Sequence, residues 1–288
     1  MRWLTNLFLW LIAVPVGLAG RFADWGTKLR QRLLYWQQFR PRPGDVYIAT
    51  YPKSGTTWMQ MILVQLASGG RAEFDHILQA SPYLDELMRF ERVDHLERLP
   101  SPRLIKTHLS YEELRPPRDA RIIFVTRDVK DTLVSCYHHA ELAARFRSPF
   151  DLFMDAMLRG RGPFRDWFAY MRSWLPHRHD ANVLWVRYED LKSDLEGQVR
   201  RIAAFTGIPL EEARLGDILQ RCGFQYMKQH DGKFDFRTGL YEASPGGFIR
   251  QGGSGGKNQL IRDEHAAELT QKVSLLRSEL GLRNTEAL

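Results

Sequence analysis

The sequence is poor in cysteine and has no cysteine–histidine pattern with the spacing of a metal site. Only Cys136 and Cys222 occur among its 288 residues. They are too far apart in the chain to form a Cys-x-x-Cys pair, so we expect neither a metal site nor a disulfide framework. The scarcity of cysteine favours a reducing, cytoplasmic setting over a secreted one.

Signatures of nucleic-acid binding, internal repeats and long low-complexity tracts are also absent. The chain is nevertheless basic, with 41 Lys and Arg residues against 34 Asp and Glu residues and a formal net charge of +7. Such a balance suits an anionic ligand, a membrane surface or a nucleic acid. Because no zinc-finger or RNA-recognition pattern accompanies it, we expect no nucleic-acid partner.

The first 40 residues are apolar at their start and rich in aromatic and basic residues at their end. Residues 3–20 carry no charge, and as a helix they would be about 27 Å long, close to the thickness of a bilayer core. Trp25, Leu29 and Leu33 then recur every four residues among several basic residues, which is typical of a helix lying on an anionic membrane. We favour a membrane anchor that leaves the following domain in the cytoplasm.

Two other interpretations of residues 1–40 stay open. A cleaved secretory signal is one, because small residues end the apolar stretch, although only Arg2 precedes it. The other is an apolar hairpin that packs on the protein itself or on a partner subunit. The turn-rich sequence Arg-Pro-Arg-Pro-Gly at residues 40–44 separates this segment from the body. We expect residues 41–288 to form a single domain.

Strand-like and helix-like patterns alternate along this body. The expected strands fall at residues 46–50, 103–108, 120–126 and 182–188. The expected helices fall at residues 57–67, 131–141 and 195–206. This alternation predicts an α/β fold with a mainly parallel central sheet flanked by helices. Ligands of such sheets bind beyond the carboxyl ends of the strands.

The turn after the first strand carries the strongest functional signal. It reads Tyr-Pro-Lys-Ser-Gly-Thr-Thr-Trp at residues 51–58 and leads into the first helix. The free N–H groups of that helix, with Lys53 and the hydroxyls of Thr56 and Thr57, predict a P-loop-like cradle for a phosphate-like anion. In the nucleotide P-loop the lysine follows the last glycine. Here Lys53 precedes Gly55, which disfavours an ordinary ATP loop.

The second strand ends in a lysine and a histidine. Lys106 and His108 are two positions apart, so their side chains face the same side of the strand end. A neutral imidazole at that place can accept a proton from a hydroxyl group. We therefore expect the pair to address one site.

The third strand ends in Arg127, eight residues before Ser135. The planar guanidinium suits phosphate oxygens and can share a phosphate with the serine hydroxyl. The alternative is a surface arginine in an ion pair with Asp128 or Asp131.

These segments resemble the cytosolic-type sulfotransferases that use 3′-phosphoadenosine-5′-phosphosulfate (PAPS). The match includes residues 51–58, 106–108, 125–137 and 187–191, and it extends over about residues 39–282. The resemblance implies an enzyme that moves a sulfuryl group from PAPS to a hydroxyl of a small acceptor, without a metal. His108 would be the catalytic base, while Lys53 and Lys106 would offset charge that grows during transfer.

The resemblance also implies which residues hold PAPS. The set comprises loop, strand-end and C-terminal residues: Lys53, Ser54, Gly55, Thr56, Thr57, Trp58, Arg127, Ser135, Tyr188, Phe224, Arg250, Gln251 and Gly252. Within it, Arg127, Ser135 and Arg250 would hold the 3′-phosphate, and Trp58 is the expected stacking partner of adenine.

The C-terminal part of the match departs from the family pattern, which reads Arg-Lys-Gly-x-x-Gly-Asp-Trp-Lys. Gln251 replaces the lysine, and the Asp-Trp pair is reduced to Gly256. With one cation fewer, we expect nucleotide binding to be weaker by about 1 kcal/mol. The family's dimerisation pattern is not recognisable after Lys257, which leaves the oligomeric state open.

Two other functions are weighed against this one. An ATP-dependent small-molecule kinase of P-loop-like fold is disfavoured by the lysine that precedes the glycine. A non-catalytic, membrane-tethered nucleotide-binding protein is disfavoured by the intact Lys53, Lys106 and His108. The acceptor is expected to be hydrophobic, because residues 74–88 and 137–153, which we expect to line its pocket, are rich in Phe, Leu, Tyr and Met.

Overall fold

The computed structural model of the chain describes residues 39–89, 94–144, 148–235, 247–250, 252 and 260–283. The predicted membrane anchor, up to residue 38, lies outside these residues, and so does Gln251. Within the described ranges, no helix is both long and apolar enough to cross a bilayer.

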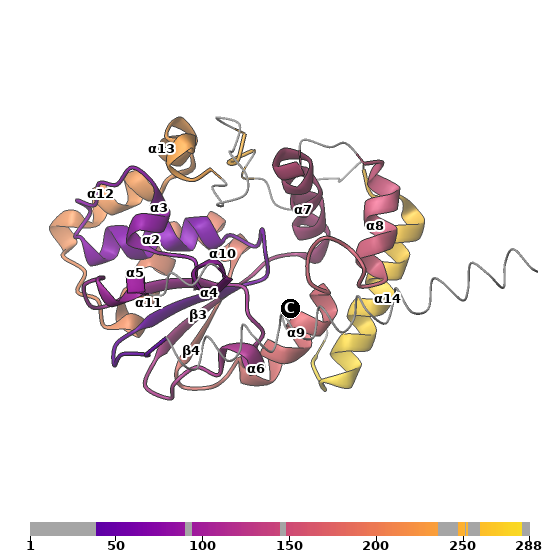
Figure 1. Ribbon diagram of the computed structural model, residues 1–288, viewed down its shortest axis with the longest axis horizontal. Coiled ribbons are helices and arrows are strands. Elements are labelled where there is room, and N and C mark those ends of the chain that lie inside the picture. Colours follow the sequence, from indigo (N-terminus) through magenta and orange to yellow (C-terminus); the bar gives the residue numbers. More distant parts are fainter. Residues whose placement is uncertain are drawn as a thin grey trace, which may run out of the picture.

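Four parallel strands form the central sheet, in the order β2-β1-β3-β4 (Figure 1). Their bounds are β1 Val46–Thr50, β2 Leu104–Thr107, β3 Arg121–Thr126 and β4 Val183–Arg187. Because the strands run in one direction, all their carboxyl ends meet at one edge of the sheet. The predicted α/β fold with a mainly parallel sheet is confirmed.

Helices cover both faces of this sheet (Figure 1). Helices α2, α10, α11 and α12 pack on one face, and α6 to α9 with α14 pack on the other. The helices and their bounds are α2 Thr56–Ala67, α3 Ile77–Ala80, α4 Leu84–Arg89, α5 Asp94–Glu97, α6 Tyr111–Leu114, α7 Val129–Ala144, α8 Phe150–Leu158, α9 Trp167–Trp174, α10 Tyr188–Ser193, α11 Leu195–Thr206, α12 Glu212–Cys222, α13 Phe224–Gln229 and α14 Asp263–Glu279, with short 3-10 turns at Leu175–His177 and Asp231–Lys233.

The alternation of side chains along the strands produces two separate cores. In β1, Tyr47 and Ala49 point into one core, whereas Val46 and Ile48 point into the other. All five residues of this strand are buried, as the sequence predicts for a strand covered on both faces.

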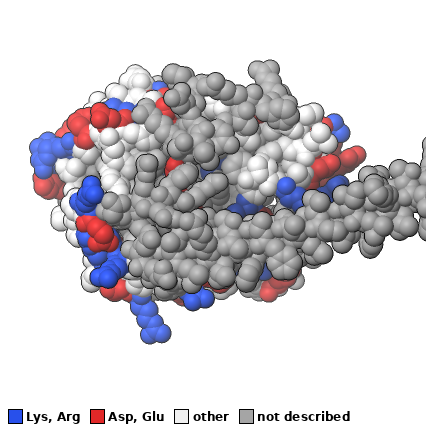
Figure 2. Space-filling view, viewed as in Figure 1, with Lys and Arg blue, Asp and Glu red and all other residues white. Residues whose placement is uncertain are grey.

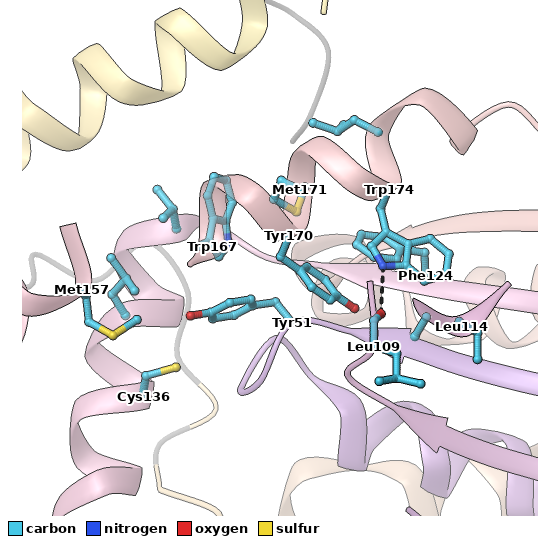
Figure 3. Packing of buried hydrophobic residues seen from close by; sticks show 14 of the residues in the cluster. Tyr51, Leu109, Leu114, Phe124, Cys136, Met157, Trp167, Tyr170, Met171 and Trp174 are labelled. Atoms are coloured by element: carbon cyan, nitrogen blue, oxygen red, sulfur yellow. Dashed lines mark hydrogen bonds between the residues drawn. The ribbon is translucent and has the colours of Figure 1, made fainter. Parts of the chain in front are cut away.

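The core on the α9 face is rich in aromatic residues (Figure 3). The ring centroids of Phe124 and Trp174 are 4.9 Å apart, and the Trp174 Nε1–H donates to the carbonyl of Leu109 at 3.2 Å. Tyr51 packs edge-on against Tyr170, with centroids 5.6 Å apart. This core therefore fixes the residue that begins the anion loop and the residue that follows His108.

A buried ion pair holds the opposite end of the sheet. The guanidinium of Arg103 donates to both oxygens of Asp45 at 2.7 and 2.6 Å, and both side chains are almost fully buried. Such a bidentate pair is directional and joins the amino ends of β1 and β2. The register of their carboxyl ends, where the site lies, is set from this anchor.

The observed elements start and end close to the predicted boundaries. The second strand is shorter than predicted, because Arg103 belongs to the ion pair and the backbone N–H of His108 donates to Asp85 instead of a neighbouring strand. Tyr188 begins α10 and does not end β4. Because β2 ends early, the backbone N–H of His108 contacts Asp85, which the sequence did not indicate.

Candidate active site

The loop between β1 and α2 has the backbone of an anion cradle. Lys53 has φ +68° and Gly55 has φ +107°, so the chain turns sharply before the first turn of α2 at Thr56. Gly55 is the N-cap and has no side chain, which leaves the first N–H groups of α2 without a side-chain cap from that position. A Cβ atom at Gly55 would lie only 2.8 Å from Cδ2 of Tyr188. Glycine is thus required here for both backbone conformation and space.

The other loop residues take different positions. Ser54 is buried, and its N–H donates to the carbonyl of Tyr51 at 3.2 Å, which closes the turn. Thr56 is buried as well, whereas Thr57 is only partly buried. Of the two predicted hydroxyl donors, Thr57 is therefore the one with the freer approach from outside the loop.

Lys53, in this loop, contacts Phe248 and Arg127. Its Nζ lies 3.9 Å from the ring centroid of Phe248, and its carbonyl oxygen accepts a hydrogen bond from Nη1 of Arg127 at 3.3 Å. Burial lowers the pKa of Lys53 to about 8, and the positive charges of Lys106 and Arg127 act in the same direction. An ammonium group in this setting gains strongly from a bound anion.

The imidazole of His108 is oriented by the end of β1. Its Nδ1 lies 2.7 Å from the carbonyl oxygen of Thr50. Because a carbonyl can only accept, Nδ1 carries the proton, and Nε2 keeps the lone pair that a base needs. Burial and the nearby charge of Lys106 hold the pKa of His108 well below its usual range, so the ring is neutral near pH 7.

A hydroxyl pair connects this base to the anion loop. The Oγ1 atoms of Thr50 and Thr56 are 2.6 Å apart, and the same Thr50 Oγ1 lies 3.2 Å from Nδ1 of His108. The base, the end of β1 and the first turn of α2 therefore form one hydrogen-bonded unit. Thr56 uses its hydroxyl for this connection.

Lys106 lies beside His108, as its position in the strand predicts. Its Nζ is 4.3 Å from the ring centroid of Tyr83, and the same ring lies edge-on to His108 at 5.1 Å. Burial lowers the pKa of Lys106 to about 8, while Asp85 and Glu86 act to raise it. The structure thus brings Lys53, Lys106 and His108 together at the carboxyl ends of β1 and β2.

Arg127 extends from β3 toward the same loop. Its guanidinium lies 4.4 Å from the ring centroid of Tyr188, and Nη2 is 3.9 Å from an oxygen of Asp131. The ion pair that we weighed as an alternative exists, but it coexists with the contact to the carbonyl of Lys53. Ser135 is one helical turn beyond Asp131 in α7, on the same side of the helix. Ser135 therefore lies on the face of α7 that carries the carboxylate partner of Arg127.

Aromatic side chains border the loop on the α12 side. Trp58 lies edge-on to Tyr188, with centroids 5.4 Å apart, and its Nε1–H donates to the carbonyl of Cys222 at 2.8 Å. Phe224 is 39% exposed and packs so closely on Gly252 that a Cβ atom there would lie 2.6 Å from the phenyl ring. The predicted nucleotide residues from α2, α10, α13 and the C-terminal loop therefore border one region.

A buried aspartate fixes the start of the C-terminal loop. Asp231 accepts hydrogen bonds from the backbone N–H groups of Phe248 and Ile249 at 3.1 and 2.8 Å. This contact holds Phe248 over Lys53. Arg250 follows, is exposed, and lowers the pKa of His138 in α7 through its charge, which comes after burial among the causes. His138 is one turn beyond Ser135, so Arg250 lies near the α7 side of the site.

Sequence reasoning missed the carboxylate nearest the base. Asp85, in α4, accepts a hydrogen bond from Thr107 Oγ1 at 2.6 Å and another from the backbone N–H of His108 at 3.0 Å. Asp85 falls in the segment expected to line the acceptor pocket. Its acidic side chain among apolar neighbours was the available signal, but its partner is more than twenty residues away in sequence.

His139 in α7 was also missed. Its ring centroid is 5.9 Å from that of Phe248 and 6.2 Å from that of Phe164. Burial, followed by the charges of Lys53 and Lys106, lowers its pKa to about 2. A second neutral imidazole therefore faces the two lysines. It is one turn beyond Ser135 on α7, which was the only sequence signal for it.

Known proteins match the chain over most of its length. The family model of the sulfotransferase domain matches residues 43–275. Sulfotransferase 1 family member D1 of Mus musculus is 30% identical over 270 residues, covering 85% of this chain and 91% of that protein. Amine sulfotransferase of Oryctolagus cuniculus is 36% identical over 199 residues, covering 66% of this chain and 65% of that protein.

The chain belongs to the sulfotransferase family. A solved structure of retinol dehydratase in complex with androsterone and the inactive cofactor PAP has the same fold, with a TM-score of 0.73 and 24% identity over 90% of this chain and 87% of that one. The predicted class is confirmed: the protein is a PAPS-dependent sulfotransferase that acts on a hydroxyl group of a small-molecule acceptor.

Proposed function

We propose that Lys53, Lys106 and His108 form the sulfuryl-transfer centre of this enzyme. The observation that carries the proposal is the hydrogen bond from Nδ1 of His108 to the carbonyl of Thr50, which leaves Nε2 as a base beside two lysines. Nε2 accepts the proton of the acceptor hydroxyl while the oxygen of that hydroxyl attacks the sulfur of PAPS. The bond between sulfur and the bridging oxygen of PAPS breaks, and its electron pair stays on that oxygen as the nucleotide leaves as 3′-phosphoadenosine 5′-phosphate (PAP).

The two lysines stabilise the charge that moves during this step. As the S–O bond breaks, negative charge grows on the bridging oxygen, and Lys53 is the cation at the mouth of the phosphate loop. Lys106 lies beside the base and offsets charge on the sulfuryl oxygens. Both ammonium groups stand in a partly desolvated region, where such interactions are stronger than in water.

The remaining predicted residues bind the nucleotide. The N–H groups at the start of α2, with Ser54, Gly55, Thr56 and Thr57, hold the 5′-phosphate, as at other helix N-termini. Arg127, Ser135 and Arg250 hold the 3′-phosphate, and Gly252 lies beside it. Trp58, Tyr188 and Phe224 border the adenine. The support is their common region in the fold.

The acceptor is proposed to be a small hydrophobic alcohol or phenol. The support is the ring-rich surroundings of the lysines, with Tyr83 next to Lys106 and Phe248 next to Lys53. Phe164 and His139 add a further ring and an imidazole. Flat, apolar hydroxyl compounds suit such walls.

The test uses the full chain and a labelled sulfuryl donor. Transfer from ³⁵S-labelled PAPS into a cell lipid extract and into simple phenols is measured, and the sulfated products are identified by mass spectrometry. Thermal shifts with PAP and with ATP plus magnesium are recorded in parallel. We expect transfer and stabilisation by PAP. Stabilisation by ATP alone, with phosphoryl transfer, would overturn the proposal in favour of a kinase, and PAP binding without any transfer would favour a non-catalytic protein.

We also propose that residues 1–40 attach this enzyme to a membrane and that residues 41–288 are one catalytic domain. The support is the uncharged run at residues 3–20 and the basic, aromatic stretch that follows it. In the described part of the face in Figure 2, basic and acidic side chains are interspersed. Sedimentation with anionic vesicles compares the full chain with residues 41–288. Equal binding of the two would refute the anchor, and loss of activity on removal of the segment would refute the independent domain.

A further inference from the structure

Asp85 connects two parts of the site that are distant in sequence. The segment that carries it runs beside β2, where the N–H of Lys106 donates to the carbonyl of Pro82 at 2.9 Å and Tyr83 forms a bridge with Lys106. Asp85 then reaches past the end of the strand. It accepts from Thr107 Oγ1 with one carboxylate oxygen and from the N–H of His108 with the other.

These two hydrogen bonds fix the place where β2 ends. Thr107 Oγ1 also accepts from the N–H of Leu109 at 3.1 Å, so the carboxylate and the hydroxyl together hold three consecutive residues, from Thr107 to Leu109. His108 is the middle one. Its backbone is held by Asp85 and its ring by Thr50, so its Nε2 has a defined position.

The charge of Asp85 has a second consequence. Burial raises its pKa above the usual value, and the hydrogen bond with Thr107, the charge of Arg165 and the N–H of His108 offset this rise in part. Lys106 is affected in return: burial lowers its pKa, and Asp85 is the largest of the opposing causes, ahead of Glu86. The base itself is neutral, so the carboxylate compensates the lysine and not an imidazolium.

We propose that Asp85 is a positioning residue for sulfuryl transfer, which fixes the strand end that carries His108 and supplies the compensating negative charge for the Lys106 ammonium. The inference rests on the proposed roles of those two residues. Asp85 touches neither the donor nor the acceptor in this scheme, and it acts through its neighbours.

The pH dependence of turnover separates this role from a merely structural one. Among the described residues, the titratable and charged groups around Lys106 come from five segments. They are Tyr83, Asp85 and Glu86 on the α4 side, Lys53 on the anion loop, His108 just after β2, His139 on α7 and Arg165 before α9. A lysine whose pKa is lowered to about 8 is charged below that pH and neutral above it. Activity that needs the ammonium group is therefore lost as the pH rises through about 8.

The experiment compares Asp85→Asn with wild type and with Glu86→Gln, the control that removes the second negative charge acting on Lys106. With 2-naphthol as acceptor and PAPS saturating, kcat/KM is followed from pH 5.5 to 9.5. For Asp85→Asn we expect a loss on the order of 10- to 100-fold at pH 7, because misplacing a catalytic group by about 1 Å can cost that much. We also expect its alkaline limb to move to lower pH by roughly one unit, with the affinity for PAP unchanged within about threefold.

A second variant separates charge from position. Asp85→Glu keeps the carboxylate but changes its reach, so the alkaline limb should stay near that of wild type while kcat falls. If Asp85→Asn lowers activity by a constant factor at every pH, or lowers PAP affinity as much as kcat, the residue is merely structural and the proposal is overturned. Full activity of Asp85→Asn overturns it as well.

A measurement without turnover distinguishes this proposal from the proposed function. The ionisation of Lys106 is followed by ¹³C NMR of its Cε in lysine-labelled protein, assigned with Lys106→Arg. The titration midpoint should be lower in Asp85→Asn than in wild type, whether or not either protein sulfates an acceptor. An unchanged midpoint in a variant that unfolds cooperatively refutes the role of Asp85, whereas absent transfer with a shifted midpoint refutes only the assigned reaction.

Discussion

The two ends of the ligand site rely on different cations. At the ends of β1 and β2, Lys53 and Lys106 are ammonium groups whose pKa values are lowered to about 8, and they stand beside a neutral imidazole. At the end of β3 the cation is Arg127, which lies on the ring of Tyr188. A guanidinium keeps its charge throughout the physiological range. The difference suggests that chemistry takes place at the lysine end and that the arginine end holds the nucleotide.

The largest effect should come from replacing the general base at the lysine end of the site. His108→Ala removes the only group that we assign to proton transfer, and kcat should fall by about 10²- to 10⁴-fold, the usual contribution of a general base. The affinity for PAP should change little, because the nucleotide is held elsewhere. Turnover with saturating PAPS and calorimetry with PAP measure the two quantities separately.

A second histidine provides the control for this change. His179 is exposed and lies outside the proposed site, so His179→Ala should leave both quantities as in wild type. If His108→Ala keeps more than a tenth of the wild-type kcat, another residue is the base, and His139, the other neutral imidazole beside the lysines, becomes the next to replace.

A change at the arginine end should weaken nucleotide binding and leave turnover nearly unchanged. If Arg127 binds the 3′-phosphate as we propose, Arg127→Gln removes a charged hydrogen bond worth about 1.5–3 kcal/mol, so the Kd of PAP should rise by roughly 10- to 150-fold. At saturating PAPS, kcat should stay within about threefold of wild type. Arg121→Gln is a suitable control, because Arg121 is the exposed residue at the other end of the same strand. A loss in kcat with unchanged PAP affinity would contradict the division between the two ends.

A change in the loop that joins the two ends should affect both the stability of the protein and its affinity for PAP. Gly55→Ala puts a Cβ atom 2.8 Å from the Tyr188 ring, at a φ that L-residues avoid. We expect unfolding to become easier by about 2 kcal/mol, one to two from the left-handed backbone and more from the contact, with weaker PAP binding as Tyr188 moves. Chemical denaturation and calorimetry provide the measurements.

The matched variant is Gly207→Ala. Gly207 ends α11 with φ +72°, and nothing lies within 4 Å of the Cβ position. It therefore carries the backbone cost without the contact, and it should lose about 1 kcal/mol of stability with no change in PAP binding. Equal effects of the two variants on PAP affinity would mean that the contact with Tyr188 does not matter.

Parts of this site that are contiguous in sequence were predictable, and parts assembled by the fold were not. Residues 51–58 form a strand end, a turn and a helix start within one short segment, so their local chemistry specifies their arrangement. Lys106 and His108 share a strand end for the same reason. The parallel sheet followed from the alternation of strand-like and helix-like patterns, and it brought these segments to one edge.

Asp85 and His139 depend on contacts between distant segments. Asp85 belongs to the site because the backbone N–H of His108 leaves the strand ladder and turns to its carboxylate. His139 belongs to it because Asp231 holds Phe248 between α7 and Lys53. The lowered pKa values of the lysines were equally hidden, since they arise mainly from burial that only the folded chain produces.

The smallest expected effect concerns Trp58, at the nucleotide end. Trp58→Phe keeps an aromatic ring next to Tyr188 but removes the Nε1–H that donates to the carbonyl of Cys222. The loss of one such hydrogen bond should reduce the free energy of unfolding by about 1 kcal/mol.

If the ring stacks on adenine, Trp58→Phe should weaken PAP binding only a few-fold, whereas Trp58→Ala should weaken it by about tenfold or more, since one stacking contact is worth about 1–3 kcal/mol. Because Trp58 belongs to the binding end, neither variant should change kcat at saturating PAPS by more than about twofold. A larger fall in kcat with PAP affinity retained would show that α2 transmits changes at the nucleotide end to Thr56, Thr50 and the base.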